Sequence, residues 1–488
     1  MHLKCLESAD RESVDVVLIT VPWVNTNIPL MAPASLKPVI DQAGFSSLCT
    51  DLNGEVYNLV QAHPQRDQIL EFFFANIKHP EVEPWIDEFL SSAVTQILSL
   101  QPKYVGLSLF TYASRSACFW LCEGIKKAAP DTVIIVGGAG CLESLTGPGT
   151  FAEELIDLGL VNYHIRGDGE HALYQLLIGN DQYPGINSPT WREITNEELH
   201  QLPWPDYGDY DFSQYERKVI GIHGSRGCVR ACTFCDYIEN WTKFQWRTAE
   251  SIFEEMKTQY KKYGMRYFKF NDTLTNGNLK EFNKLIRLLA DHNTANPADR
   301  LHWGGYYIFR EQSANDEEMW ETIARSGASF LVVGIENLNE DIRYHIGKKF
   351  SNASIDYHLA QAKKHRISML LLFIVGYVTE TQQHIEFSKK WLEDHVEFKD
   401  SIQIHWDQTL AIFPNTYLHR NKDKLGITLG TNPHLWINIE TGTDQTVRAR
   451  WIQELVAKSQ ELGYNILDKV DNHYYLEQKL SALSMKNL

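Results

Sequence analysis

Gly224-Ser225-Arg226-Gly227-Cys228-Val229-Arg230-Ala231-Cys232-Thr233-Phe234-Cys235 is the most informative segment of this 488-residue chain. Its three cysteines form a Cys-x3-Cys-x2-Cys pattern, with an aromatic residue directly before the last one. Thiolates are soft ligands that suit zinc and iron–sulfur clusters. A structural zinc site takes four protein ligands, whereas a four-iron cluster held by three cysteines keeps one iron open. Gly224 and Gly227 allow the backbone to wrap closely around a bulky group, because glycine has no Cβ.

This segment, with its aromatic residue at Phe234, resembles the cysteine loop of the radical S-adenosylmethionine (SAM) superfamily. The resemblance implies that Cys228, Cys232 and Cys235 bind a [4Fe–4S] cluster whose open iron chelates the amino and carboxylate groups of SAM. It also implies that an electron from the cluster cleaves SAM to a 5′-deoxyadenosyl radical. The three cysteines alone leave a zinc knuckle or three free thiols open as alternatives.

Composition limits the class of protein. Hydrophobic residues make up 43% and charged residues 22% of the chain, which is typical of a globular protein with two or three domains. The net charge of −16 argues against nucleic-acid binding and against docking on anionic membranes. Eight cysteines are too few for a disulfide framework. With neither a signal peptide nor a membrane span in the sequence, we expect a reducing, cytoplasmic location.

Short apolar runs alternate with helical stretches in the first third of the chain. Strands are predicted at residues 14–20, 45–50, 104–109, 132–136 and 162–165. This alternation predicts a doubly wound (Rossmann-like) parallel sheet, which binds its ligand beyond the carboxyl ends of the strands. Ser108, Gly137, Gly138 and Gly167 fall at those ends.

These pieces resemble the cobalamin-binding domain that precedes many radical SAM domains. Tyr104-Val105-Gly106-Leu107-Ser108-Leu109 is similar to that family's third-strand motif, and Val136-Gly137-Gly138 to its double-glycine motif. Gly167-Asp168-Gly169-Glu170 is similar to its Gly-Glu-Gly-Glu segment, with Asp168 in place of the first Glu. The resemblance implies cobalamin contacts at Ser108, Leu109, Gly137, Gly138, Gly167 and Glu170. It also implies that the double glycine, Gly137-Gly138, lets the nucleotide tail lie against the backbone.

The loop after the first strand departs from the cobalamin pattern. It reads Val21-Pro22-Trp23-Val24-Asn25-Thr26-Asn27, so the Asp-x-His-x-x-Gly sequence, whose His coordinates cobalt in mutases, is absent. Cobalt would therefore lack a protein His ligand. A doubly wound domain without cobalamin stays open as the alternative, because one fold hosts many functions.

A polar, proline-containing segment follows and reads as a linker. The predicted organisation is a cobalamin-binding-like domain at 1–185, a linker at 186–214, a radical SAM domain at 215–420 and a C-terminal region at 421–488.

The centre of the chain repeats a strand–helix unit. Strands are predicted at 219–223, 267–270, 303–309, 330–335 and 368–375, with a sixth from residue 402. Helices are predicted at 249–263, 279–292, 316–326, 355–364 and 381–392, with Ser354 as the N-cap of the fourth. Six such units predict a partial (β/α)6 TIM-like barrel, whose site lies at the carboxyl ends of the strands.

Polar residues follow four of these strands, in segments that resemble the family's SAM-binding motifs. They are Asn271-Asp272, Arg310, Glu336-Asn337 with Arg343 and Lys348 downstream, and Gly376-Tyr377. Backbone near Asn271 and Asp272 is expected to accept from the SAM amine. Arg310, or alternatively Arg343 or Lys348, is expected to pair with its carboxylate. Glu336 is expected at the ribose, and Ile374, Gly376 and Phe234 at the adenine. A single acid after a strand is also a common helix cap.

The C-terminal region shows no chemical motif. Residues 446–462 predict an amphipathic helix that ends at Gly463, and the region is expected to be small and mostly helical. His473, Tyr474 and Tyr475 are candidates either for a substrate cavity or for an ordinary half-buried surface.

The resemblance implies a cobalamin-dependent radical SAM enzyme that methylates an unactivated carbon. One SAM methylates the cobalamin, and a second yields the radical that activates the substrate, so the cofactors carry the chemistry. The implied partners are a small-molecule or natural-product substrate and an electron donor such as flavodoxin or ferredoxin. The alternatives are a radical cyclisation, rearrangement or ring contraction without methyl transfer, and a cluster-bearing binding protein that never cleaves SAM.

Overall fold

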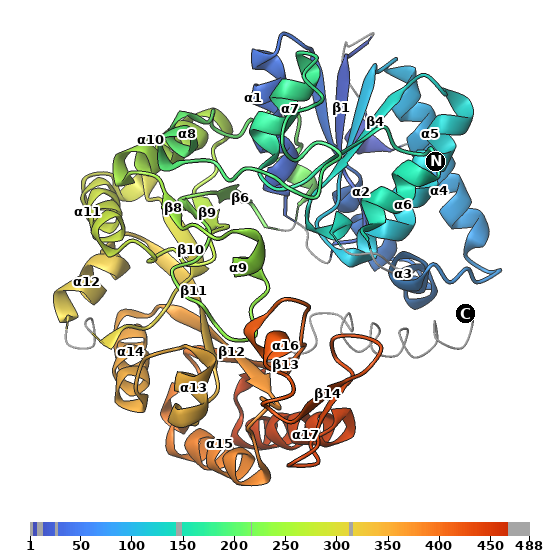
Figure 1. The fold of residues 1–488 in the computed structure, drawn as a ribbon. Helices are drawn as coiled ribbons and strands as arrows, with labels where there is room; N and C mark the ends of the chain where they lie inside the picture. The colour runs from blue at the N-terminus through green and yellow to red at the C-terminus, as the bar shows by residue number, and fades with distance from the viewer. Residues whose placement is uncertain are drawn as a thin grey trace. The chain divides into compact units, whose positions relative to one another are not determined.

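The protein divides into two compact units, the first up to Gly221 and the second from Ile222 to Val470. A computed structural model describes residues 3–6, 13–24, 28–142, 149–215, 217–311 and 316–466. Each unit is built on its own sheet, and the predicted α/β fold class is confirmed (Figure 1). Within the described residues, no helix has both the length and the apolar character needed to cross a bilayer.

The first unit contains a five-stranded parallel sheet in the order β2-β1-β3-β4-β5. The strands are β1 (Val16–Thr20), β2 (Ser47–Asp51), β3 (Tyr104–Ser108), β4 (Val133–Gly137) and β5 (Tyr163–Ile165). All five predicted strands are present, within two residues of their predicted ends. Every residue of β1 and β2 is buried, because helices cover both faces of a parallel sheet.

Helices cover the two faces of this sheet. They are α1 (Met31–Gln42), α2 (Leu52–Gln61), α3 (Arg66–Ala75), α4 (Glu83–Ser99), α5 (Arg115–Ala128), α6 (Phe151–Asp157) and α7 (Gly169–Leu177). Figure 1 shows α1 and α7 on one face and α4, α5 and α6 on the other. The main apolar core lies on the second face, where Val105, Val136 and Leu121 are buried together.

The segment predicted as a linker packs onto the first unit. It contains a short helix, α8 (Asn196–Gln201). Asp209 pairs with the buried ammonium of Lys37 on α1 and accepts a hydrogen bond from the backbone of Cys49 at 2.9 Å. Tyr215, the residue directly after this segment, donates to Asp51, at the end of β2, at 2.7 Å. These buried polar contacts hold the segment against α1 and β2.

The second unit contains a seven-stranded sheet in the order β16-β13-β12-β11-β10-β9-β6. The strands are β6 (Val219–Ile222), β9 (Tyr267–Phe270), β10 (His302–Tyr306), β11 (Ala328–Glu336), β12 (Ser368–Val375), β13 (Ile402–Thr409) and β16 (Asn465–Ile466). The first six lie side by side in chain order, which is the arrangement of the predicted partial barrel. The short edge strand β16 was not predicted.

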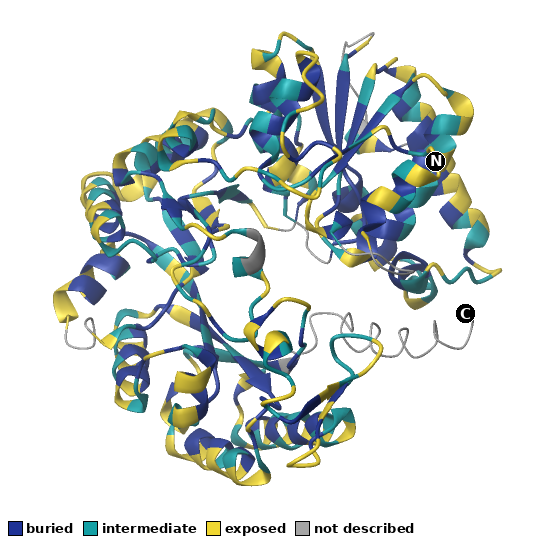
Figure 2. Cartoon of the chain, in the orientation of Figure 1, coloured by how far each residue is buried: buried dark blue, intermediate teal, exposed yellow. Residues whose placement is uncertain are grey.

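Helices of the second unit pack on the outer face of this sheet. They are α10 (Ala249–Tyr263), α11 (Leu279–Ala295), α12 (Glu317–Arg325), α13 (Glu340–Ile346), α14 (Asn352–His365), α15 (Gln382–Asp394) and α17 (Gln445–Leu462). Phe270, Trp303 and Phe282 pack edge to face between sheet and helices. Figure 2 shows the resulting pattern, with buried strands and helices that expose one side.

Smaller elements complete the second unit. Two antiparallel pairs form, β7 (Ser225–Arg226) with β8 (Gln245–Trp246), and β14 (Ile427–Leu429) with β15 (Trp436–Asn438). Two short helices, α9 (Tyr237–Asn240) and α16 (Tyr417–Arg420), follow the cysteine segment and β13. The predicted C-terminal helix is confirmed as α17, with Gly463 as its left-handed cap. His473, Tyr474 and Tyr475 lie outside the described residues.

Candidate functional site

The cysteine loop, residues 224–235, begins two residues after β6 and is anchored at its start by Asp272, which follows β9. The Asp272 carboxylate accepts hydrogen bonds from Gly224 N at 2.7 Å and Ser225 Oγ at 2.8 Å. At Gly227, φ is +76°, and a Cβ would lie 2.0 Å from the Lys243 carbonyl oxygen. Only glycine fits there, so the expected close wrapping of the loop has a local cause.

The second half of the loop is fixed through Thr233. Its N–H donates to the Ile346 carbonyl at the end of α13 (2.9 Å), and its carbonyl accepts from Leu418 N in α16 (3.1 Å). Its hydroxyl lies 2.8 Å from the hydroxyl of the buried Tyr377, just after β12. Three separate elements therefore hold the residue between Cys232 and Phe234.

The three candidate ligands have different surroundings. Cys232 is 7% exposed, and Cys228 and Cys235 are half-buried. Burial raises the pKa of Cys232 to about 12. Burial also raises the pKa of Cys235, although hydrogen bonds from the backbone of Tyr237 and Ile238 oppose this rise. Without a metal these two thiols are protonated at neutral pH, so binding of a metal would release protons.

The number of cysteines bears on which group the loop fits. Within the described residues, no three His, Cys, Asp or Glu side chains are placed to hold one metal ion. A closed structural zinc site takes four protein ligands. The loop offers three cysteines, two of them in an apolar core, and three soft thiolates suit a four-iron cluster that keeps one iron open.

An apolar core surrounds the loop and contains candidate SAM contacts. Cys232, Ile374, Tyr377 and Leu418 are buried together, with Phe234 and Cys235 packed against them. The structure thus brings two of the candidate ligands beside Phe234 and Ile374, the two apolar residues expected at the adenine.

Asp272 gives the site a pH-dependent stability. Burial raises its pKa from an ordinary value of 3.8 to about 6, against the opposing hydrogen bonds from Gly224 and Ser225. The folded protein therefore binds this proton more tightly than the unfolded chain. The stabilisation is complete below pH 4 and is lost as pH rises to about 6, a change of about 2–3 kcal/mol.

We expect Asp272→Asn to remove this part of the pH dependence, because asparagine keeps the shape but does not titrate. The measurement is the unfolding midpoint of the metal-free protein between pH 4 and 7. Asp51→Asn is the comparison variant. Burial also raises the pKa of Asp51 to about 6, so this variant is expected to remove a separate part of the pH dependence, which belongs to the first unit. An unchanged pH profile for Asp272→Asn, relative to the wild type, would contradict the assignment.

Glu336 closes β11 in an unusual conformation. Its φ is +64°, which is rare for a residue with a side chain. Its carboxylate lies 3.1 Å from Lys348 Nζ, and both side chains are about nine-tenths buried. The structure thus joins the residue expected at the ribose to one of the three candidate carboxylate partners.

The turn after β12 is built around Gly376. Glu380 accepts hydrogen bonds from Gly376 N at 2.5 Å and Tyr377 N at 3.1 Å, and from Asn337 Nδ2 at 2.7 Å. A Cβ at Gly376, where φ is +86°, would lie 2.2 Å from Cδ of the buried Arg448 on α17. Glu380 and Arg448 were missed as site residues. The position of Glu380 near Gly376 was a usable signal, but nothing in the sequence links Arg448 to this turn.

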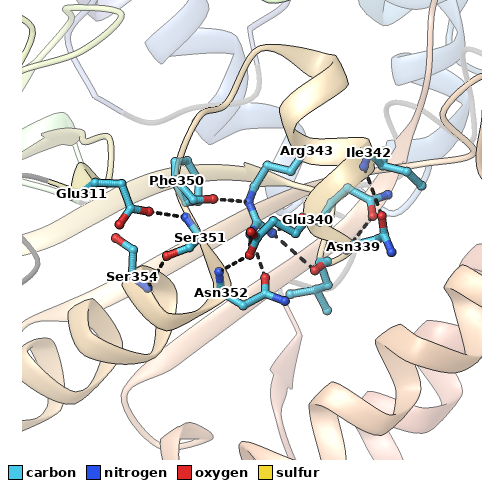
Figure 3. Close-up of polar contacts among 11 residues, drawn as sticks. Glu311, Asn339, Glu340, Ile342, Arg343, Phe350, Ser351, Asn352 and Ser354 are labelled. Atoms are coloured by element: carbon cyan, nitrogen blue, oxygen red, sulfur yellow. Dashed lines mark hydrogen bonds and ion pairs between the residues drawn. The ribbon is translucent and has the colours of Figure 1, made fainter.

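Arg343 is a correction to the expected site. Figure 3 shows its guanidinium enclosed by protein groups, and its side chain is fully buried. Nε donates to Phe350 O at 2.9 Å, Nη1 to Asn337 O at 2.9 Å, and Nη2 to Asn352 Oδ1 at 2.7 Å. Because these contacts use the guanidinium internally, Arg343 stabilises the chain after β11 and does not face a ligand.

Asn271 directly follows β9, whereas Arg310 lies four residues beyond β10, which ends at Tyr306 and not at residue 309 as predicted. Asn271 is exposed, and its N–H donates to Ile222 O at 2.9 Å. Arg310 is half-buried and donates through Nη2 to Asn276 O and Gly277 O, each at 3.0 Å. Burial and the nearby Arg230 lower the pKa of Arg310. A guanidinium next to another cation favours an anionic group between them.

The carboxyl edge of the first unit's sheet brings together the candidate cobalamin contacts of β3 and β4. Leu109 N donates to Gly137 O at 2.9 Å, and a Cβ at Gly138 would lie 2.3 Å from Leu109 O. A Cβ at Gly167 would overlap the Trp191 ring at 2.0 Å. Packing of the protein itself therefore requires glycine at 138 and 167, and the expected contact of the double glycine with a nucleotide tail stays a prediction.

Two exposed aromatic residues follow β3 at this edge. Phe110 and Tyr112 are 60% and 45% exposed. Ser108 and Gly137 are half-buried, and Glu170 is buried in the first turn of α7. Large exposed aromatic side chains are frequent at ligand and partner sites.

Comparison with known families identifies the second unit. Residues 222–392 match the family model of the Radical SAM superfamily. They form a radical SAM domain. This domain contains the cysteine loop and every candidate SAM contact, and radical SAM proteins use a [4Fe–4S] cluster with SAM, as the sequence predicted.

Relatives that match part of the chain support an enzyme. An uncharacterized methyltransferase of Pyrococcus horikoshii is 24% identical over 62% of this chain and 67% of its own length. The anaerobic magnesium-protoporphyrin IX monomethyl ester cyclase of Synechocystis is 20% identical, over 52% of each chain. The chain thus spans only half to two thirds of these relatives. The prediction of a radical SAM enzyme is confirmed by the domain and by such relatives.

Solved structures share the order of the two units. The radical SAM methyltransferase TsrM of Kitasatospora setae, with cobalamin and a [4Fe–4S] cluster bound, superposes with a TM-score of 0.61 at 13% identity. The match covers 97% of this chain and 100% of that one. The resemblance to radical SAM proteins with a cobalamin-type first domain is therefore confirmed for the fold.

Proposed function

We propose that this protein is a cobalamin-dependent radical SAM methyltransferase that acts on an unactivated carbon. The observation that carries the proposal is the cysteine loop, which Asp272, Thr233 and Tyr377 fix at the carboxyl ends of the barrel strands. Relatives named as methyltransferases and the TsrM-like fold support methyl transfer as the outcome.

The proposed cofactor-binding residues come from both units. In residues 215–420, Cys228, Cys232 and Cys235 would hold the cluster, and the Gly376 turn with Ile374 would hold the adenine. Arg310 is the proposed partner of the SAM carboxylate. In residues 1–185, the edge with Ser108, Leu109 and Gly137 would hold cobalamin. These groups, when bound, would supply the chemistry, in which two SAM and two electrons convert R–H to R–CH3, S-adenosylhomocysteine, 5′-deoxyadenosine and methionine.

The proposal includes partners and a location. The substrate would be a small molecule or natural product, and the electrons would come from a flavodoxin or ferredoxin. Nucleic acid is not an expected partner, given the net charge of −16. A reducing cytoplasm would suit a cluster that oxygen damages.

Anaerobic purification with cobalamin supplied, followed by iron, sulfide and cobalt analysis, is the first test. The expected result is about four iron and four sulfide per chain, with stoichiometric cobalt. Incubation with SAM and dithionite should then give 5′-deoxyadenosine. Zinc in place of iron would overturn the whole proposal, and cobalt-free protein that still cleaves SAM would overturn methyl transfer.

A radical cyclase is the second candidate, favoured by the relative that is named as one. Product analysis with candidate substrates separates the two. A methylated product together with S-adenosylhomocysteine supports the methyltransferase, whereas 5′-deoxyadenosine with an isomerised or oxidised product supports the cyclase.

A further inference from the structure

Two adjacent lysines, Lys348 and Lys349, have opposite environments. Lys349 is exposed, whereas Lys348 is buried. Lys348 Nζ lies 3.1 Å from Glu336 Oε1, and the two side chains are only 11% and 10% exposed. A buried ammonium loses several kcal/mol of hydration, and its carboxylate partner offsets part of that loss.

The fold makes specific room for this ion pair. A Cβ at Gly334 would lie 2.3 Å from Glu336 Oε1 and 2.9 Å from Lys348 Nζ. Glu336 itself adopts φ +64°, which costs about 1 kcal/mol or more. Glycine at position 334 leaves room for the pair, and the strained backbone at Glu336 orients its carboxylate. These two features together indicate a functional role for the pair.

The segment that carries Lys348 runs beside the cysteine loop. Thr233 N donates to Ile346 O at 2.9 Å. A Cβ at Gly347 would lie 3.2 Å from Ala231 O and 3.5 Å from Cys232 Cα. Residues 346–348 therefore pack directly against residues 231–233.

The Lys348 ammonium affects the pKa of Cys232 more strongly than the Glu336 carboxylate does. After burial itself, the Lys348 charge has the largest influence on the pKa of Cys232, which it lowers, while Glu336 has a smaller, opposite effect. Conversely, Cys232 and Cys228 both favour the charged form of Lys348. Lys348, in a segment that packs against residues 231–233, therefore lies close enough for its charge to act on Cys232 and Cys228.

We propose that the Lys348–Glu336 pair sets the reduction potential of the cluster, with Lys348 favouring the reduced form and Glu336 opposing it. This inference rests on the proposed cluster. Reduction adds one electron from a low-potential one-electron donor, with no bond made or broken, and so adds one negative charge. A buried positive charge nearby stabilises that added charge, because the surrounding dielectric is low.

A role in binding the SAM carboxylate, which the sequence left open for Lys348, gives a different result. Such a contact changes the cluster only when SAM is present. The potential is therefore measured without SAM, where only the direct effect of the charge remains.

The test is an anaerobic redox titration of the reconstituted full-length protein, followed by electron paramagnetic resonance of the reduced cluster. At a fixed potential, Lys348→Met is expected to lower the ratio of reduced to oxidised cluster about tenfold, which is 59 mV for one electron. Glu336→Gln is expected to raise this ratio, and Lys348→Arg to keep it within about threefold. Lys349→Met, the control with the same loss of charge at an exposed site, is expected to leave it unchanged.

Shifts of opposite sign for Lys348→Met and Glu336→Gln support the proposal, because damage to the loop would not reverse sign with the charge removed. Unchanged potentials in both variants overturn it. If Lys348→Met takes up no cluster, Glu336→Gln decides: a raised potential supports the proposal, and an unchanged one overturns it. A wild-type protein without any cluster would refute the proposed function itself, which is a separate result.

Discussion

Cys232→Ala is expected to abolish the iron–sulfur cluster and, with it, the formation of 5′-deoxyadenosine. Cys232 is the most buried of the three candidate ligands, and Thr233 is held by three elements. The loop is therefore not expected to bring a substitute ligand to the vacated corner. After anaerobic reconstitution, iron should fall from about four atoms per chain to background.

Cys122→Ala is the matched control for this experiment. Cys122 is a fully buried thiol on α5 of the first unit, 4.0 Å from the sulfur of Cys118. Its replacement costs packing, on the order of 1 kcal/mol, but removes no candidate ligand. Full iron content is expected for this variant. A full, SAM-cleaving cluster in Cys232→Ala would show that the ligand assignment is wrong.

Arg343→Met is expected to lower the stability of the second unit by about 3–5 kcal/mol, because it leaves several buried oxygens without a donor. These are the carbonyls of Asn337 and Phe350 and the side-chain oxygen of Asn352. Arg343→Lys should also destabilise, since one ammonium cannot reproduce the planar fork of a guanidinium. The measurement is the thermal midpoint of the metal-free protein.

Arg325→Met provides the comparison. Arg325 is half-exposed and lies 3.9 Å from Glu321 in a surface pair, so its loss should change stability by less than about 0.5 kcal/mol. If Arg343→Met instead kept full stability and weakened only SAM binding, the original expectation of a carboxylate contact would be restored.

The strands and the cysteine loop could be predicted because their signals are local. Five apolar runs in the first unit and six in the second alternate with helices, and this alternation predicts parallel sheets. The cysteine spacing is also local, since all three thiols lie within eight residues. Polar residues at strand ends follow from the same order, because parallel strands share one carboxyl edge.

Contacts that depend on the exact course of the chain could not be predicted. The helix N-cap expected at Ser354 is wrong, because the side chain of Ser351 accepts from Ser354 N and starts α14 a turn earlier. The role of Arg343 depends on oxygens of Asn337, Phe350 and Asn352. These oxygens surround the guanidinium because residues 340–346 form α13, a helix that was not predicted. Trp191, which explains Gly167, comes from a segment that composition alone described as a linker.

The contact between Arg448 and Gly376 has a consequence for how this enzyme can be cut or recombined. Residues 222–392, the part that matches the superfamily, end more than fifty residues before Arg448. A fragment limited to that match would lack the Arg448 side chain that packs against the Gly376 turn. Transfer of this domain into another scaffold would therefore have to include α17, the helix that carries Arg448.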